Sequence, residues 1–243
     1  MNVICSSFGK DSFATIIIAH DLGIEIDKVI YCKIMFDSEI SAEVPEHERF
    51  INEVAKPKVE KDFGYPVETV VADKTYIDGF MRPICKGPRC GMLTGSPLCR
   101  GCWVQRDLKV RPMERHMRSL GPGVISYVGI AKDEDQRLAR LTETRVSLLE
   151  REGFTKKDTR NICASVDLLS PVYDFAPRNG CFFCPNAKPP ELAHLRKHHP
   201  ELWGRMLELE ATPGVVRKKY NRDLFLSDME WNFQVDESQL SLF

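Results

Sequence analysis

The stretch Met1-Asn-Val-Ile-Cys-Ser-Ser-Phe-Gly-Lys-Asp-Ser12 decides how the rest of this sequence is interpreted. An apolar run at residues 3–5 predicts a buried strand, and the apolar run at residues 13–20 predicts a helix. The loop between them consists of Ser6, Ser7, Phe8, Gly9, Lys10, Asp11 and Ser12. A strand, a glycine-containing loop and a helix together offer backbone N–H groups and a positive helix end to a phosphate. The alternative is an ordinary turn whose polar residues only cap the helix.

Three further apolar runs, at residues 28–36, 67–71 and 124–130, predict strands that alternate with helical segments. This βαβαβ rhythm predicts an α/β fold in which helices cover a parallel sheet. Ligands bind such sheets at the carboxyl ends of the strands. We therefore expect the loop, Asp37 and Asp73 to share one rim of the sheet.

Composition narrows the class of protein. The chain has 243 residues, a hydrophobic content of 43% and a formal net charge of −1. It can therefore bury a sizeable core, and no global basic field attracts nucleic acid. No apolar run approaches the roughly 20 residues of a membrane span, and no secretory signal is visible. A cytoplasmic protein without a membrane partner is the expectation.

Nine cysteines are many for such a chain, and an odd number in an intracellular context argues against a disulfide framework. Two CxxC pairs, Cys99/Cys102 and Cys181/Cys184, indicate metal ligands or redox pairs. Zn²⁺ and a [4Fe–4S] cluster suit four thiolates equally well. The irregular loop at residues 79–103 holds the first pair. We predict a nucleotide-binding α/β domain at residues 1–155 and a cysteine-rich, mostly helical region at residues 156–243.

Charged residues beside the predicted strand ends are candidates for nucleotide and Mg²⁺ binding. Lys10 supplies a point charge for a phosphate, and Asp11 either orients Lys10 or holds Mg²⁺. Asp37 follows the second strand, although a helix cap would also explain it. Asp133 and Glu134 follow the fourth strand, with Arg137 one turn beyond; a solvated first helical turn is the simpler alternative for this acidic run.

Several motifs carry a family resemblance. The sequence at residues 7–12 resembles the S-G-G-K-D-S loop of PP-loop ATP pyrophosphatases, with Phe8 in place of the first glycine. Residues 36–43, 102–112, 127–137 and 180–186 are similar, in order, to segments of the PAPS (3′-phosphoadenylyl-sulfate) reductase-like branch of that superfamily. The combination is far more specific than any one motif.

The resemblance implies an α/β sandwich of the adenine nucleotide alpha hydrolase-like type. It implies attack on the α-phosphate of ATP, giving an adenylylated substrate and pyrophosphate. The residues it assigns to the nucleotide are those of the loop, with Asp37, Gly129 and Arg137; Lys10, Asp11 and Asp133 take the catalytic roles. It favours a [4Fe–4S] cluster on Cys102, Cys163, Cys181 and Cys184, whereas spacing alone would choose Cys99 over Cys163.

The resemblance is incomplete at one point. PAPS reductases use a cysteine near the C-terminus, and no cysteine follows Cys184 here. The sequence therefore favours ATP-dependent sulfur transfer, to a nucleic acid or small-molecule acceptor, with a possible sulfur-donor protein. The alternatives are a sulfonucleotide reductase-like enzyme and a non-catalytic nucleotide-binding module with structural zinc. Basic residues at 194–199 and 217–222 are candidate contacts for an anionic acceptor, or simply solvated surface.

Overall fold

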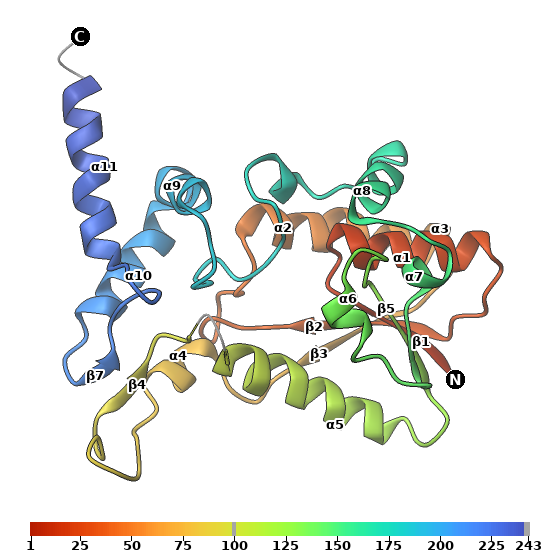
Figure 1. Cartoon of the computed structure of the whole chain (residues 1–243), viewed down its shortest axis with the longest axis horizontal. Helices are drawn as coiled ribbons and strands as arrows, with labels where there is room; N and C mark the ends of the chain where they lie inside the picture. Colours follow the sequence, from red (N-terminus) through yellow and green to blue (C-terminus); the bar gives the residue numbers. More distant parts are fainter. Residues whose placement is uncertain (99–100, 241–243) are drawn as a thin grey trace. The chain divides into compact units, whose positions relative to one another are not determined.

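A five-stranded parallel sheet forms the centre of the first part of the molecule (Figure 1). The computed structural model describes residues 1–98 and 101–240. The strand order is β3-β2-β1-β5-β6, and every pair in it is parallel. The strands are β1 (Asn2–Ser6), β2 (Lys28–Lys33), β3 (Val67–Val71), β5 (Ile125–Val128) and β6 (Arg145–Val146). The predicted parallel-sheet α/β fold is confirmed.

Helices cover both faces of this sheet. On one face, Ile4 of β1 and Val29 and Tyr31 of β2 belong to a large core shared with the helices. Those helices are α1 (Lys10–Asp21), α2 (Pro45–Phe50), α3 (Lys56–Asp62), α7 (Leu148–Arg151) and α8 (Lys156–Ser165). The alternate residues Val3 and Ile30 point to the opposite face, where α5 (Arg111–Ser119) covers them. This alternation follows from the two-residue period of a strand.

Two helical runs contain π-helical turns, and a third short segment is a 3₁₀ helix. The π segments are η1 (Ile51–Ala55), between α2 and α3, and η2 (Gln105–Val110), which runs into α5. Pro171–Asp174 forms the 3₁₀ helix η3. The Ser170 hydroxyl accepts from the Val172 N–H and Pro171 begins the turn, which together favour a helical start.

The chain divides into two compact units whose segments alternate along the sequence. The first consists of Met1–Lys33, Glu43–Val71 and Arg111–Asn179, and the second of Ile34–Ala42, Ala72–Val110 and the chain from Gly180 onward. Residues 156–179, which the sequence analysis grouped with the C-terminal region, therefore lie in the first unit. The reason is that α8 packs on α1 beside the loop.

The second unit is mostly helical and includes a two-stranded parallel sheet, β4-β7. Its remaining elements, and the short α6 of the first unit, have the following bounds: α4 (Tyr76–Phe80), β4 (Leu93–Gly95), α6 (Asp135–Leu138), α9 (Pro189–His198), α10 (Pro200–Ala211), β7 (Val215–Arg217) and α11 (Leu226–Leu240). Among the described helices, none is both long and apolar enough to cross a membrane.

Candidate functional site

The loop between β1 and α1 has an unusual backbone at Phe8. Phe8 adopts a φ of 53°, in the left-handed region that usually favours glycine. Its ring is 1% exposed and lies 5.5 Å from the ring of Tyr31 and 6.1 Å from that of Phe13. Phe8 therefore packs beneath the loop and leaves the upper surface, where a phosphate would lie, to backbone and small side chains.

Serine hydroxyls hold the loop in shape. The Ser7 N–H donates to the Ser12 hydroxyl at 3.2 Å, and the Phe8 N–H donates to the Ser6 hydroxyl at 2.9 Å. The Ser12 hydroxyl in turn donates to the Gly9 carbonyl at 3.0 Å. These bonds fix the backbone of the loop, and they occupy the N–H groups of Ser7 and Phe8.

Residues from distant parts of the first unit support the loop, and they were not among the site residues predicted from the sequence. His47, fully buried, lies 2.8 Å from the Ser170 hydroxyl through Nδ1 and 3.0 Å from the Ser7 carbonyl through Nε2. The Asn179 amide donates to the Ser7 hydroxyl at 3.3 Å. The Tyr173 hydroxyl accepts from the Lys10 N–H at 2.8 Å. No spacing in the sequence connects these residues with the loop, because they belong to separate segments of the chain that meet only in the folded structure.

Lys10 and Asp11 form an ion pair at the start of α1, and Thr159 of α8 completes it. The Lys10 ammonium lies 2.5 Å from Asp11 Oδ1 and 3.2 Å from the Thr159 hydroxyl. The Thr159 hydroxyl donates to the same Asp11 oxygen at 2.6 Å. Asp11 thus orients Lys10, which is one of its two predicted roles, and the fully buried Thr159 fixes Asp11.

Cys163 of α8 lies beside the same loop. Its side chain is fully buried and its Sγ donates to the Lys10 carbonyl at 3.2 Å. Burial, followed by the charge of Asp11, raises the pKa of the Cys163 thiol to about 12. In the first unit, therefore, this thiol packs against the loop at residues 6–12 as a neutral S–H group.

The segment after β5 contributes a close backbone contact and a charged cluster. A Cβ on Gly129 would lie 2.4 Å from the Ser12 nitrogen, so only glycine allows this strand end to approach the loop. Arg137 donates to both carboxylate oxygens of Glu134 at 2.9 Å. Asp133 accepts from the Lys156 N–H at 3.1 Å, at the start of α8. This contact with α8 was not among the roles expected for Asp133, and its predicted catalytic role stays a prediction.

Asp37 belongs to the second unit, where it makes a turn. Its Oδ1 accepts from the Glu39 and Ile40 N–H groups at 2.9 and 2.8 Å, and its Oδ2 accepts from Arg205 at 3.0 Å. Burial alone would raise the pKa of Asp37, but these hydrogen bonds hold it below the ordinary value. Its predicted contact with ATP stays a prediction.

Three of the predicted metal ligands lie in the second unit around one buried tyrosine. The ring of Tyr76 lies 3.9 Å from that of Phe183, which stands between Cys181 and Cys184, and 5.5 Å from that of Trp103, which follows Cys102. Burial, followed by the charges of Cys181 and Cys102, raises the pKa of Tyr76. Two cysteine segments far apart in the sequence therefore meet here. Cys99, the fourth ligand that spacing would choose, lies outside the described residues.

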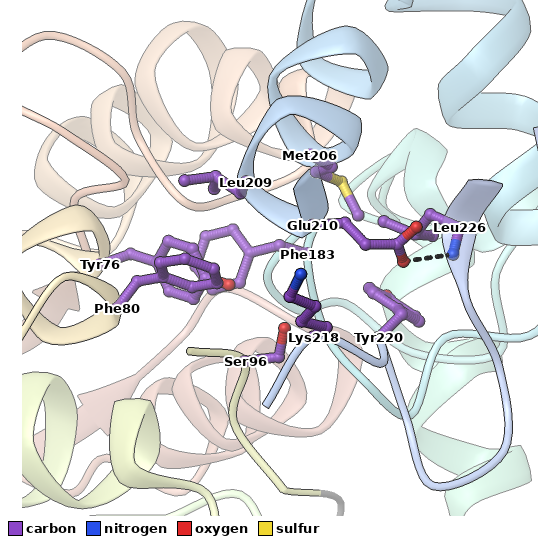
Figure 2. Close-up of a pocket in the computed structure, with 10 residues that line it drawn as sticks. All are labelled: Tyr76, Phe80, Ser96, Phe183, Met206, Leu209, Glu210, Lys218, Tyr220 and Leu226. Carbon is purple, nitrogen blue, oxygen red and sulfur yellow. Dashed lines mark hydrogen bonds between the residues drawn. The ribbon is translucent and has the colours of Figure 1, made fainter. Parts of the chain in front are cut away.

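A small pocket opens beside this aromatic cluster in the second unit (Figure 2). Tyr76, Phe80 and Phe183 form one side, and the Glu210 carboxylate, which accepts from the Leu226 N–H at 2.6 Å, lies on another. Its cavity volume of about 10 Å³ is far below the roughly 300–1,000 Å³ of typical small-molecule sites. We therefore do not place the nucleotide there.

Comparisons with known proteins find similarity in solved structures. No family model matches the chain, and no curated protein matches it. The crystal structure of phosphoadenylyl-sulfate (PAPS) reductase from Candida auris, in a phosphate complex, is similar with a TM-score of 0.46 and 10% identity, over 71% of this chain and 75% of that chain. The U34-tRNA thiolase NcsA from Methanococcus maripaludis, with its [4Fe-4S] cluster, is similar with a TM-score of 0.43 and 16% identity, over 88% of this chain and 72% of that chain.

At identities of 10% and 16% these similarities concern the fold alone. The chemistry has to be argued from the residues of this chain.

Proposed function

We propose that this protein is an ATP-dependent PP-loop enzyme that cleaves ATP at the α-phosphate to adenylylate an acceptor for sulfur transfer. The observation that carries the proposal is the loop at residues 6–12. The loop, the Lys10 side chain and the N-terminus of α1 lie together at the carboxyl end of β1, where parallel sheets bind ligands. The neighbours of β1 on its two sides are β2 and β5, so the loop also lies at a topological switch point.

Different residues of the site have different proposed roles in ATP binding. The backbone amides and the Ser7 and Ser12 hydroxyls bind and orient the polyphosphate. Lys10 neutralises charge that develops on the phosphates, and it must leave part of its contact with Asp11 to do so. The carboxylates of Asp11 and Asp133 are oxygen ligands of the kind that Mg²⁺ prefers. Gly129 supplies the close packing behind the loop, and Asp37 and Arg137 remain candidates for contacts with the nucleotide.

The thiols of Cys102, Cys181 and Cys184 are of the type that holds a cluster or a zinc ion, and the proximity of Cys102 and Cys181 to Tyr76 supports a shared site. The fourth ligand is Cys163, as the family resemblance implies, or Cys99, as the spacing implies. When bound, a [4Fe–4S] cluster supplies a place to hold sulfur for transfer to the activated acceptor.

Product analysis tests the nucleotide chemistry. Incubation with ATP and Mg²⁺, with RNA or DNA as acceptor, should release pyrophosphate and no ADP. Lys10→Ala should weaken ATP binding at least tenfold, because it removes the charge that contacts the phosphates. The matched control is Lys61→Ala, an exposed lysine of α3 in the same unit, which should bind ATP as the wild type does. Release of ADP and phosphate, or an unchanged affinity of Lys10→Ala, would contradict the proposal.

Metal analysis tests the cofactor. Protein purified without oxygen should contain iron and acid-labile sulfide, and Cys102→Ser, Cys181→Ser and Cys184→Ser should each lose both. Comparison of Cys163→Ser with Cys99→Ser then identifies the fourth ligand, since only the variant that lacks a ligand should lose iron. Zinc without iron would overturn the cluster while leaving the ATP chemistry intact.

A further inference from the structure

The small sheet of the second unit joins two segments that contain basic residues and no acidic ones. Residues 79–106 carry Arg82, Lys86, Arg89, Arg100 and Arg106, and residues 211–222 carry Arg217, Lys218, Lys219 and Arg222. Neither segment contains an aspartate or glutamate, although acidic residues slightly outnumber basic ones in the whole chain. Such a separation of charge within a nearly neutral protein concentrates positive potential on one surface.

The pairing of β4 with β7 brings these segments together, as Figure 1 shows. Gly95 of β4 is opposite Arg217 of β7, and the Ser96 N–H donates to the Arg217 carbonyl at 3.0 Å. On the other side of β4, the Thr94 N–H donates to the Arg82 carbonyl at 2.9 Å. Arg82 and Arg217 therefore flank the same strand. Arg89 lies in the adjoining turn, where its carbonyl accepts from the Met92 N–H at 3.1 Å.

The arginines of this surface repel one another, and one of them has a buried N–H group without a partner among the described residues. The Nε of Arg217 is buried, and among the described residues it has no hydrogen-bond partner. Burial, followed by the charges of Arg82 and Arg89, lowers the pKa of Arg217. Arg82 lies 3.6 Å from Asp107, but Asp107 is already held by two bonds of 2.8 Å from Arg106. Holding like charges close together costs free energy, and a bound anion would offset that cost. The arrangement therefore indicates a surface that binds an anion.

We propose that this basic surface, formed by Arg82, Lys86, Arg89, Arg217, Lys218 and Lys219, binds the phosphate backbone of a nucleic acid. A single small anion would need one or two of these cations, whereas the six are distributed over residues 82–89 and residues 217–219, on the two segments that flank β4. Guanidinium groups bind phosphodiester oxygens in a bidentate fashion, and a chain of phosphates suits a row of them. The same nucleic acid would be the acceptor in the proposed function. Only this assignment of the acceptor rests on the proposed function.

Salt-dependent binding tests the basic surface directly. Fluorescein-labelled RNA hairpin, single-stranded DNA and duplex DNA of one length are titrated with the full chain, without ATP, from 50 to 200 mM salt, by fluorescence anisotropy. Lys86→Gln/Arg89→Gln changes two exposed side chains of a turn and leaves the strands intact. We expect at least tenfold weaker binding and a slope of log K against log salt reduced by roughly one to two.

The control is Lys61→Gln/Arg118→Gln, which removes the same charge from exposed positions of the first unit. It should retain wild-type affinity and slope. Absence of binding by the wild type, or equal weakening in the control, would overturn the proposal. The probe that binds most tightly identifies RNA or DNA as the source of the phosphates. Binding without pyrophosphate release would refute only the proposed function, and pyrophosphate release without binding would refute only this surface.

Discussion

Gly9 tests the loop most directly, because a side chain at this position has no room. A Cβ on Gly9 would lie 2.3 Å from Asn179 Oδ1 and 3.0 Å from the Tyr173 hydroxyl oxygen. Both partners are hydrogen-bonded to the loop, so they cannot move without loss of its shape. We therefore expect Gly9→Ala to weaken ATP binding at least tenfold, as measured by calorimetry.

Gly204 provides the matched control for that substitution. It lies within α10, and nothing approaches within 4 Å of a Cβ added there. Gly204→Ala should leave ATP affinity unchanged and stabilise the protein by about 0.5–1 kcal/mol, because glycine is unfavourable inside a helix. If Gly9→Ala also binds ATP normally, then the loop does not hold the nucleotide in the shape described.

Phe8 stands where the PP-loop motif has glycine. Replacing it with glycine would affect the free energy of unfolding in two opposite ways. Phe8→Gly would relieve a left-handed backbone, worth about 1 kcal/mol, but would remove a ring that is 1% exposed, which costs about 3–5 kcal/mol. The packing term is larger, so we expect net destabilisation of about 2–4 kcal/mol in urea unfolding. Asp167→Gly, at the exposed residue with a φ of 56°, should instead be neutral or stabilising. Stabilisation by Phe8→Gly would show that the ring contributes little.

Helix α11 is held to α9 and α10 by the carboxylate of Glu230. Arg196 of α9 donates to it at 2.8 and 3.1 Å, and Trp203 of α10 donates at 2.7 Å. A hydrogen bond to a charged group contributes about 1.5–3 kcal/mol. We expect Glu230→Gln, which keeps the shape and removes the charge, to lower the free energy of unfolding by about 2 kcal/mol.

The pH dependence of that loss has a defined sign. The bond from Arg196, with those from Trp203 and Gln234, lowers the pKa of Glu230 from 4.5 to about 2. The stabilisation is therefore complete above pH 4.5 and disappears as the pH falls from 4.5 to about 2. The stability difference between wild type and Glu230→Gln should shrink over that window. A constant difference would mean that charge at Glu230 is not the source of the stabilisation.

The central sheet of the molecule was predictable because its information is local. Each strand is an apolar run of a few residues, and the alternation with helices leaves a parallel sheet as the natural arrangement. The loop at residues 6–12 was predictable for the same reason, since its residues are contiguous. The residues that support the loop from other elements were not predictable. His47, Thr159 and Tyr173 reach the loop only after three separate elements have packed, and nothing in their local sequence differs from ordinary helix positions.

The division of the chain into two units could not be predicted from local sequence either. A boundary drawn from a change in composition assumes that each domain is one continuous segment, whereas here the chain passes between the units several times. The cysteines illustrate the consequence. Cys163 packs with the loop at residues 6–12 in the first unit, while Cys102 and Cys181 lie near Tyr76 in the second. Spacing along the sequence cannot distinguish these environments.

All three tryptophans, Trp103, Trp203 and Trp231, lie in the second unit, which makes their fluorescence a selective probe of the proposed metal site. Trp103 is 4% exposed, follows Cys102 directly and stacks on Tyr76. Removal of the metal by an anaerobic chelator should loosen this segment and shift the emission to longer wavelength as water reaches the indole. Trp103→Phe should abolish the shift, whereas Lys10→Ala, whose change lies in the first unit, should retain it. An unchanged emission maximum after the metal has been removed would separate Trp103 from the metal site, and a shift that persists in Trp103→Phe would assign it to another tryptophan.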